Sequence, residues 1–152
     1  MTGKGSRRAR RGFTLVEVLT ALVVIAVLTA IAVPTWRTHL LRARRGDGMA
    51  ALIALQSAQD RYFGRNARYA TAAQLAASPP AGLGLAENSA RGFYRIELEA
   101  TSDGLGYTAT ARVLPQEGQA ADTRCVELGI DHNGIRRAQD ADGVDRAADC
   151  WR

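Results

Sequence analysis

Few side chains in this 152-residue sequence have the type and spacing to do chemistry. Glu17 is a single carboxylate inside an apolar run from Phe13 to Val33, and Cys125 and Cys150 are the two cysteines. Four carboxylates also lie close together near the end of the chain: Asp140, Asp142, Asp145 and Asp149. The chemistry to consider is a charge contact in a membrane, a disulfide or zinc site, and a calcium site.

The four carboxylates of Asp140–Asp149 fit a calcium loop poorly. The EF-hand pattern is D-x-D-x-D-G followed by a glutamate, whereas here the glycine follows the second acid and no glutamate closes the loop. We therefore predict a solvated acidic loop held by Cys150, with no metal. His39 and His132 have no recognisable nucleophile or metal-ligand context, and no phosphate loop or dinucleotide fingerprint is present. These observations predict no enzyme and no cofactor.

Three uses of the two cysteines are considered: free thiols, a zinc site and a disulfide. Two cysteines with distant histidines lack the usual spacing of zinc ligands, and thiols stay reduced in the cytosol. Beside a segment that targets the membrane, an exported domain with one Cys125–Cys150 disulfide is the simpler interpretation.

The basic character of the chain comes from its first twelve residues. The formal charge is +5, and five positive side chains precede Phe13. From Phe13 onward, 15 arginines balance 15 acids. Cleavage after residue 12 would leave no net charge for nucleic acid to recognise.

The apolar run Phe13–Val33 has 21 residues, about 32 Å as a helix, which matches a hydrocarbon core of about 30 Å. A signal peptide has a shorter apolar region, although Ala30-Ile31-Ala32 imitates its cleavage site. We expect a membrane anchor. Arginines follow the run as well as precede it, so charge counting favours an inside N-terminus only slightly.

The stretch "GFTLVEV", Gly12–Val18, follows a short basic leader and opens the apolar run. This combination resembles the N-terminus of a type IV prepilin. The tail, with a strand from Cys125, a hairpin at Asn133-Gly134 and a final Cys150-Trp151, resembles the closing region of small PilE-type minor pilins. The resemblance implies that prepilin peptidase cuts between Gly12 and Phe13 and methylates the amine of Phe13. It also implies that Glu17 pairs with that amine of a neighbouring subunit; otherwise Glu17 lies at the level of the lipid headgroups.

The helix that carries these residues extends past the apolar run. Pro34 predicts either a break or a kink, and Gly46 and Gly48 mark a second weak point. Beyond them the sequence stays helical to about Phe63. One face carries apolar side chains for packing on a sheet, from Leu52, Leu55, Tyr62 and Phe63.

After residue 63 the chain becomes rich in small residues and then alternates as strands do. Strand-like runs are Phe93–Ala100, Gly106–Pro115 and Cys125–Asp131, and Asn133-Gly134 predicts a hairpin to a short fourth strand. We predict an α+β fold in which the long helix packs on an antiparallel sheet of three to four strands. The expected parts are a leader (1–12), an assembly helix (13–33), a helix entering the domain (34–63) and a C-terminal pilin domain (64–152).

The expected function is a structural subunit of a type IV pilus. Its expected partners are prepilin peptidase, other pilin subunits, the inner-membrane assembly machinery and the membrane itself. We expect the subunit to be held in the inner membrane with its C-terminal domain outside the cytoplasm before assembly, and to be part of the cell-surface pilus afterwards. A type II secretion pseudopilin and a DNA-uptake pilin are the alternatives, and adhesion and twitching motility stay open. For nucleic acid, which is not favoured, the candidate patch is Arg112, Arg124, Arg136 and Arg137.

Overall fold

A computed structural model describes residues 14–115 and 118–152, with the backbone alone at residues 34 and 35. Gly12 and Phe13 lie outside the described residues. The chain forms two units, one ending at Thr38 and one spanning His39–Arg152. The elements are α1 (Leu15–Asn66), the 3-10 helix η1 (Ala72–Gln74), β1 (Tyr94–Ala100), β2 (Tyr107–Val113), the 3-10 helix η3 (Gln119–Ala121), β3 (Glu127–Asp131), β4 (Arg136–Gln139) and α2 (Ala147–Cys150).

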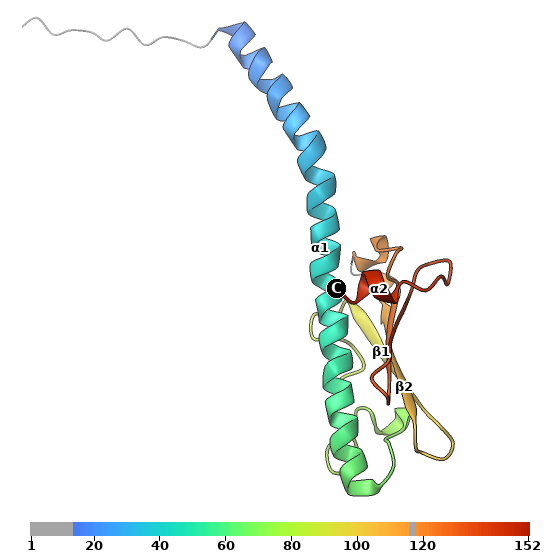
Figure 1. Cartoon of the computed structure of the whole chain (residues 1–152). Coiled ribbons are helices and arrows are strands. Elements are labelled where there is room, and N and C mark those ends of the chain that lie inside the picture. The colour runs from blue at the N-terminus through green and yellow to red at the C-terminus, as the bar shows by residue number, and fades with distance from the viewer. Residues whose placement is uncertain (1–13, 116–117) are drawn as a thin grey trace, which may run out of the picture. The chain divides into compact units, whose positions relative to one another are not determined.

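The four strands form one antiparallel sheet in the order β1-β2-β3-β4, so each strand pairs with its neighbour in the sequence. Along β1, buried and exposed side chains alternate, as expected for a sheet with one covered face. The part of α1 from His39 onward lies along that face (Figure 1). The predicted fold class, a long helix packed on a small antiparallel sheet, is confirmed.

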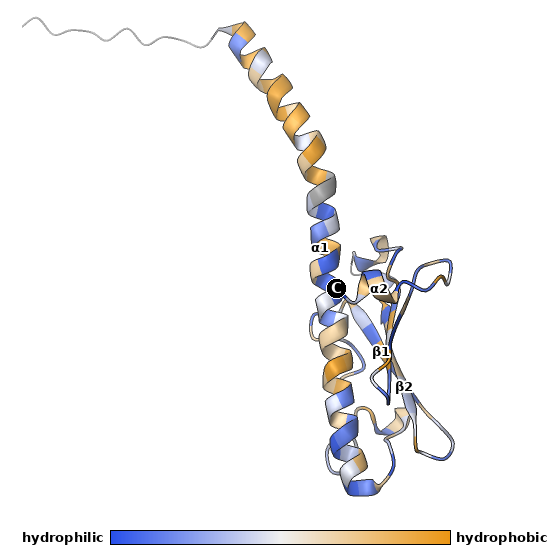
Figure 2. Cartoon of the chain, in the orientation of Figure 1, coloured by the Kyte–Doolittle hydropathy of each residue, from blue (hydrophilic) through white to orange (hydrophobic). Residues whose placement is uncertain are grey.

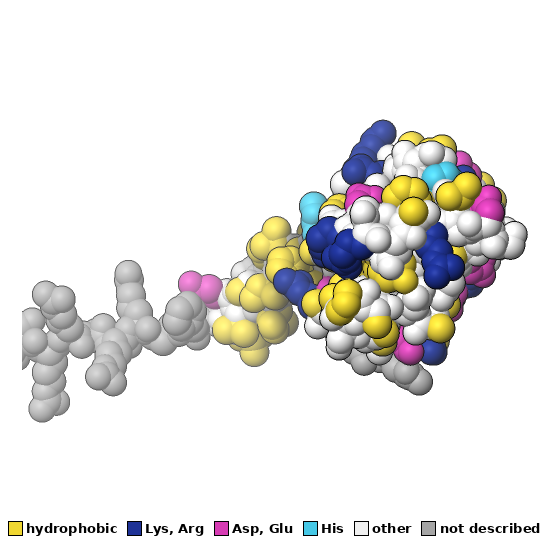
Figure 3. Space-filling model, turned by 90° about the horizontal axis from the view of Figure 1, so that it is seen from below, with side chains coloured by type: hydrophobic (Ala, Val, Ile, Leu, Met, Phe, Trp, Pro, Cys, Tyr) yellow, Lys and Arg dark blue, Asp and Glu magenta, His cyan; other side chains and the backbone are white. Residues whose placement is uncertain are grey.

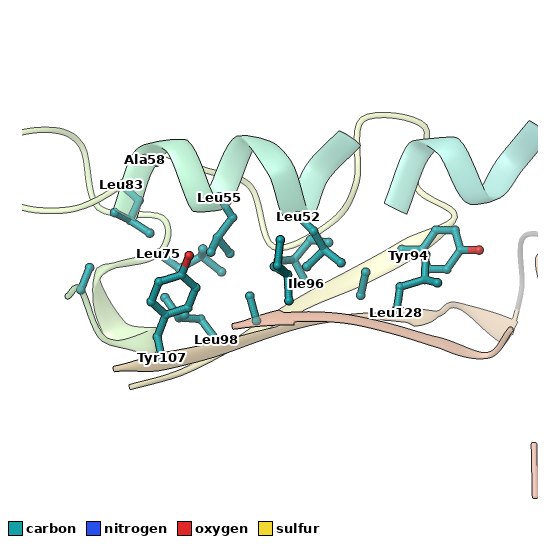
Figure 4. Close-up of a cluster of buried hydrophobic side chains, with 14 of the residues drawn as sticks. Leu52, Leu55, Ala58, Leu75, Leu83, Tyr94, Ile96, Leu98, Tyr107 and Leu128 are labelled. Atoms are coloured by element: carbon teal, nitrogen blue, oxygen red, sulfur yellow. The ribbon is translucent and has the colours of Figure 1, made fainter. Parts of the chain in front are cut away.

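The core lies between α1 and the sheet. Leu52 and Leu55 of α1 are completely buried, and they face Ile96 and Leu98 of β1 (Figure 4). Tyr62 is also buried on this face, whereas Phe63 is half-buried and its ring lies 4.6 Å from that of Tyr69. Burial of large apolar side chains at about 25 cal/mol per Å² is what holds the helix to the sheet.

Helix α1 continues through Pro34 and through Gly46 and Gly48, so neither predicted weak point ends it. A bend at Pro34 stays a prediction. Gly48 has a packing role, because a Cβ there would come within 3.0 Å of the Tyr94 ring. At Gly46 such an atom would meet nothing within 4 Å. The absence of a side chain at Gly48 therefore allows α1 to lie close to β1.

The unit that ends at Thr38 has a different surface. Every described side chain from Leu15 to Val33 is exposed, and Figure 2 shows this stretch of α1 as almost uniformly hydrophobic. By length and composition the helix is able to cross a membrane. Trp36, 70% exposed, directly follows the stretch.

Candidate assembly segment and pilin domain

Glu17 lies in the first turn of α1, where its carboxylate is exposed and contacts no cation among the described residues. Its backbone N–H donates to Oγ1 of Thr14 at 3.2 Å. The order Thr-x-x-Glu is the sequence pattern of a capping box, and a carboxylate near a helix N-terminus is favourable. Thr14 was not singled out in the sequence, although this pattern identifies it. Thr14 thus caps the start of the helix, and the carboxylate of Glu17 has no partner among residues 14–115 and 118–152.

A buried ion pair ties α1 to the loop between β2 and β3. Arg45 Nε and Nη2 donate to the two carboxylate oxygens of Asp122 at 2.6 and 2.7 Å. Asp122 is 3% exposed and Arg45 is 8% exposed. The hydrogen bonds to Asp122 raise the pKa of Arg45 above its ordinary value, although burial acts in the opposite direction. Sequence reasoning missed this pair, since 77 residues separate its members.

Gln119 of η3 extends this contact into the core. Its Nε2 donates to Asp122 Oδ2 at 3.0 Å, to Tyr94 Oη at 3.2 Å and to the Leu41 carbonyl at 3.3 Å. Burial raises the pKa of Tyr94 to about 12, and the bond from Gln119 offsets part of that rise. The β2–β3 loop, α1 and β1 therefore meet in one polar network.

The C-terminal end is closed by a disulfide between Cys125 and Cys150, whose Cα atoms are 5.9 Å apart. Beside it, Arg124 pairs with Asp149 at 3.6 Å. Trp151 Nε1 donates to the Arg137 carbonyl at 2.8 Å, and the Arg136 guanidinium lies 5.0 Å from the centre of the Trp151 ring. The last residues are thus fixed to β4 by covalent and polar contacts.

Two turns of the domain repeat one pattern. Asp131-x-Asn-Gly-Ile-x-Arg137 precedes and enters β4, and Asp140-x-Asp-Gly-Val-x-Arg146 follows it. In each turn, Oδ1 of the first aspartate accepts from the N–H groups two and four residues on. Its Oδ2 accepts from the arginine six residues on. Self-comparison of the sequence would have found this repeat.

The second turn corrects one prediction. Asp142 and Asp145 are exposed, as a solvated loop requires, but Asp140 is buried. Its backbone hydrogen bond from Val144 and its bond to Arg146 lower the pKa of Asp140. Both of its oxygens already accept hydrogen bonds, so they serve the turn. No cluster of three metal-ligating side chains occurs within 14–115 and 118–152.

Three members of the candidate arginine patch, which the sequence does not favour, pair separately with acidic side chains. Arg112 pairs with Glu127 at 2.6 Å, Arg124 with Asp149, and Arg137 with Asp131 at 3.1 Å. Arg136 stacks on Trp151 instead. Acidic partners at these distances cancel most of the field that would attract phosphate.

A different group of arginines lies where α1 ends. Arg61, Arg65 and Arg68 are exposed, and none has a carboxylate within ion-pair distance in the described part of the chain. We call these three the basic end. Arg68 and Tyr69 line a hollow of about 300 Å³ together with Thr101, Asp103 and Gly104 of the β1–β2 turn. Figure 3 views the molecule from below and shows basic side chains separated by uncharged and apolar surface.

Comparisons with known proteins agree with this architecture. Residues 7–33 match the prokaryotic N-terminal methylation motif, and residues 34–129 match the family described as type IV minor pilin ComP, DNA uptake sequence receptor. Type II secretion system core protein G of Klebsiella michiganensis is 35% identical over 68 residues, 45% of this chain and 48% of that protein. Type IV major pilin protein PilA of Myxococcus xanthus is 36% identical over 59 residues, 39% of this chain and 27% of that protein.

The chain spans about half or less of the length of the curated relatives it matches. A type IV pilin structure from Shewanella oneidensis matches with a TM-score of 0.46 and 25% identity, covering 63% of this chain and 89% of that one.

The methylation motif joined to an exposed apolar helix and a packed sheet domain defines a membrane-anchored subunit of a pilus or pseudopilus. More narrowly, the match over residues 34–129 covers more than half of the chain. The chain belongs to the type IV minor pilin ComP, DNA uptake sequence receptor family.

Proposed function

We propose that the chain is a minor subunit of a type IV pilus, assembled through the N-terminal part of α1. The observation that carries this proposal is the contrast within one helix. Its side chains up to Val33 are exposed and apolar, whereas Leu52 and Leu55 hold the pilin domain. Lipid covers such a surface before assembly, and neighbouring helices cover it afterwards. The C-terminal domain then lies outside the cytoplasm.

Processing and assembly follow from the N-terminus. Prepilin peptidase cuts between Gly12 and Phe13, and Phe13 becomes the methylated end. The free carboxylate of Glu17 pairs with the Phe13 amine of a neighbour, since an intramembrane charge is stable only with a partner.

Two substitutions test this proposal in cells. Glu17→Ala should leave cleavage intact and strongly reduce incorporation into sheared pili, as immunoblots of membrane and pilus fractions would show. Gly12→Leu should leave the leader attached, as the N-terminal mass would show. Normal incorporation of Glu17→Ala would contradict the pairing.

A type II secretion pseudopilin is the second candidate, because core protein G relatives are 32–37% identical to the chain over 65–68 residues, which is 43–45% of its length. The same sheared fractions discriminate. Recovery of the chain with surface pili supports the pilus, whereas loss of protein secretion with intact pili after deletion supports the pseudopilus.

A DNA-receptor role for the pilus subunit rests on the family match over residues 34–129 and on the basic end. Phosphate groups bind most readily to arginines that have no acidic partner, as in the basic end. Arg61 and Arg65 are four residues apart on α1, so they lie on one face of the helix. Arg68 follows two residues after the helix ends.

This role is tested with the processed chain in detergent micelles and a labelled DNA duplex. Three phosphate contacts predict that affinity falls roughly 40-fold between about 50 and 200 mM salt. Replacing Arg61, Arg65 and Arg68 by alanine should remove most of this salt dependence. Arg112→Ala is the matched control, because its charge is already paired. No binding at low salt would exclude the role.

A further inference from the structure

A group of arginines follows the apolar stretch of α1, which ends at Val33. Its members are Arg37, Arg42, Arg44 and Arg45. The first acidic side chain after the stretch is Asp47, so the group contains no internal partner. In Figure 2, the colour of α1 changes from hydrophobic to hydrophilic after the apolar stretch. Cleavage within the methylation motif, residues 7–33, leaves all four arginines on the chain.

Two of the four arginines serve the pilin domain. Arg45 is 8% exposed and forms the buried ion pair described above. Arg44 is half-buried, and its guanidinium lies 4.8 Å from the centre of the Phe93 ring. Arg37 and Arg42 are exposed, and neither has a carboxylate within ion-pair distance in residues 14–115 and 118–152. These two charges are therefore accessible to a ligand outside the chain.

Distance along α1 places both exposed arginines near the surface of a bilayer that holds the apolar stretch. Arg37 follows Val33 by four residues and Arg42 follows it by nine, which is about 6 Å and about 14 Å of helix. The headgroup layer is about 5–8 Å thick. Helical side chains lean toward the N-terminus, so the long side chain of Arg42 leans back toward the membrane. Trp36, which is 70% exposed, lies where aromatic anchors of membrane helices are common.

The chemistry of this layer indicates the ligand. A guanidinium forms bidentate hydrogen bonds with phosphate, and in an anionic lipid no choline or ethanolamine cation competes for that phosphate. Each arginine near an anionic leaflet strengthens attachment about fivefold. Membrane insertion does not explain the two charges. The positive-inside rule favours arginine on the cytoplasmic flank, whereas these arginines precede the domain that we place outside.

We propose that Arg37 and Arg42 bind the headgroups of anionic phospholipids in the leaflet next to the pilin domain. Each guanidinium contacts the continuous headgroup layer by itself, and Trp36 lies among the same headgroups. This binding requires only that α1 is anchored in a bilayer. Under the proposed function, a subunit that joins the filament leaves the bilayer and breaks these contacts, so the lipid favours the unassembled subunit.

The test uses the processed full chain in vesicles of phosphatidylcholine that contain a trace of spin-labelled lipid. The label is carried by phosphatidylglycerol in one sample and by phosphatidylcholine in the other. Electron paramagnetic resonance measures the fraction of each labelled lipid held at the protein, and this measurement does not depend on pilus assembly. Association of phosphatidylglycerol should exceed that of phosphatidylcholine by about threefold or more at low salt. The ratio should fall toward one in about 1 M sodium chloride.

Two double variants show which arginines produce this preference. Arg37→Ala, Arg42→Ala should bring the ratio close to one at low salt. Arg61→Ala, Arg65→Ala is the matched control. It removes the same charge more than about 40 Å farther along α1, well beyond the range of screened attraction, and should keep the original ratio.

Three results would overturn the proposal. The first is a ratio near one for the unmodified chain, and the second is an equal loss of preference in both double variants. The third is loss of the preference in inorganic phosphate but not in sodium chloride of the same ionic strength, which would assign the arginines to free phosphate.

Discussion

The two ends of α1 are built for different surroundings. Up to Val33 its side chains are apolar and exposed, whereas from Arg45 to Tyr62 one face is buried against the sheet. A helix that is apolar on all sides is stable in lipid or among other helices, and one with a single apolar face is stable on a domain. One continuous helix therefore serves as a membrane anchor at one end and as part of the domain core at the other.

The largest effect should come from breaking the Arg45–Asp122 pair. Asp122→Ala leaves a buried guanidinium without its partner and should lower the free energy of unfolding of the domain by about 3–5 kcal/mol. Arg42→Ala, an exposed arginine on the same helix, should change it by less than about 0.5 kcal/mol. Denaturant unfolding of the full chain in micelles, followed by circular dichroism, measures both. Equal losses of unfolding free energy for Asp122→Ala and Arg42→Ala would mean that the part of α1 packed on the sheet begins after Arg45.

A pair of leucines compares the two ends directly. Leu55→Ala removes a completely buried side chain and should cost about 2–5 kcal/mol of domain stability. Leu22→Ala, in the exposed apolar stretch, should leave domain unfolding unchanged and instead weaken retention in the membrane fraction. Domain destabilisation by Leu22→Ala would mean that the exposed apolar stretch also stabilises the domain.

Gly46 and Gly48 of α1 should respond in opposite ways to substitution by alanine. Gly48→Ala places a methyl group against the Tyr94 ring and should destabilise the domain by about 1–3 kcal/mol. Gly46→Ala meets open space and should stabilise the helix by up to about 1 kcal/mol. The same unfolding measurement should therefore give opposite signs for the two variants.

The smallest effect concerns the phenol of Tyr94. Burial raises its folded pKa to about 12, above the ordinary value of 10, so folding favours the protonated phenol. By linkage, this contribution to stability is complete below about pH 10 and is lost as the pH rises toward 12. Alkaline titration followed by tyrosinate absorbance should show two late-ionising phenols. Tyr94→Phe should remove one of them and leave that of Tyr107, whose pKa burial also raises. Titration of every phenol near pH 10 would contradict the burial of the Tyr94 phenol.

Local patterns predicted the anchor, the long helix and the strands because each leaves a short-range signal. The apolar run, the alternation along β1 and the Asn133-Gly134 turn are all of this kind. Contacts between distant residues leave no such signal. The sequence does not distinguish Arg45 from the arginines near it, and only the fold shows that it pairs with Asp122. Likewise, only the fold shows that Arg112, a member of the candidate patch, pairs with Glu127. The 3-10 helix η3 and helix α2 were missed, since a segment of one turn has no periodicity to detect.

The Cys125–Cys150 disulfide has a mechanical consequence. A fibre subunit that is pulled through its N-terminal helix could lengthen by unravelling from the sheet. The disulfide encloses β3, β4 and both aspartate turns in a loop with a sequence separation of 25 residues. At about 3.4 Å per extended residue, roughly 85 Å of chain cannot be drawn out while the bond is intact. Under load, the covalent loop therefore limits how far this subunit can stretch before the force passes to its neighbours.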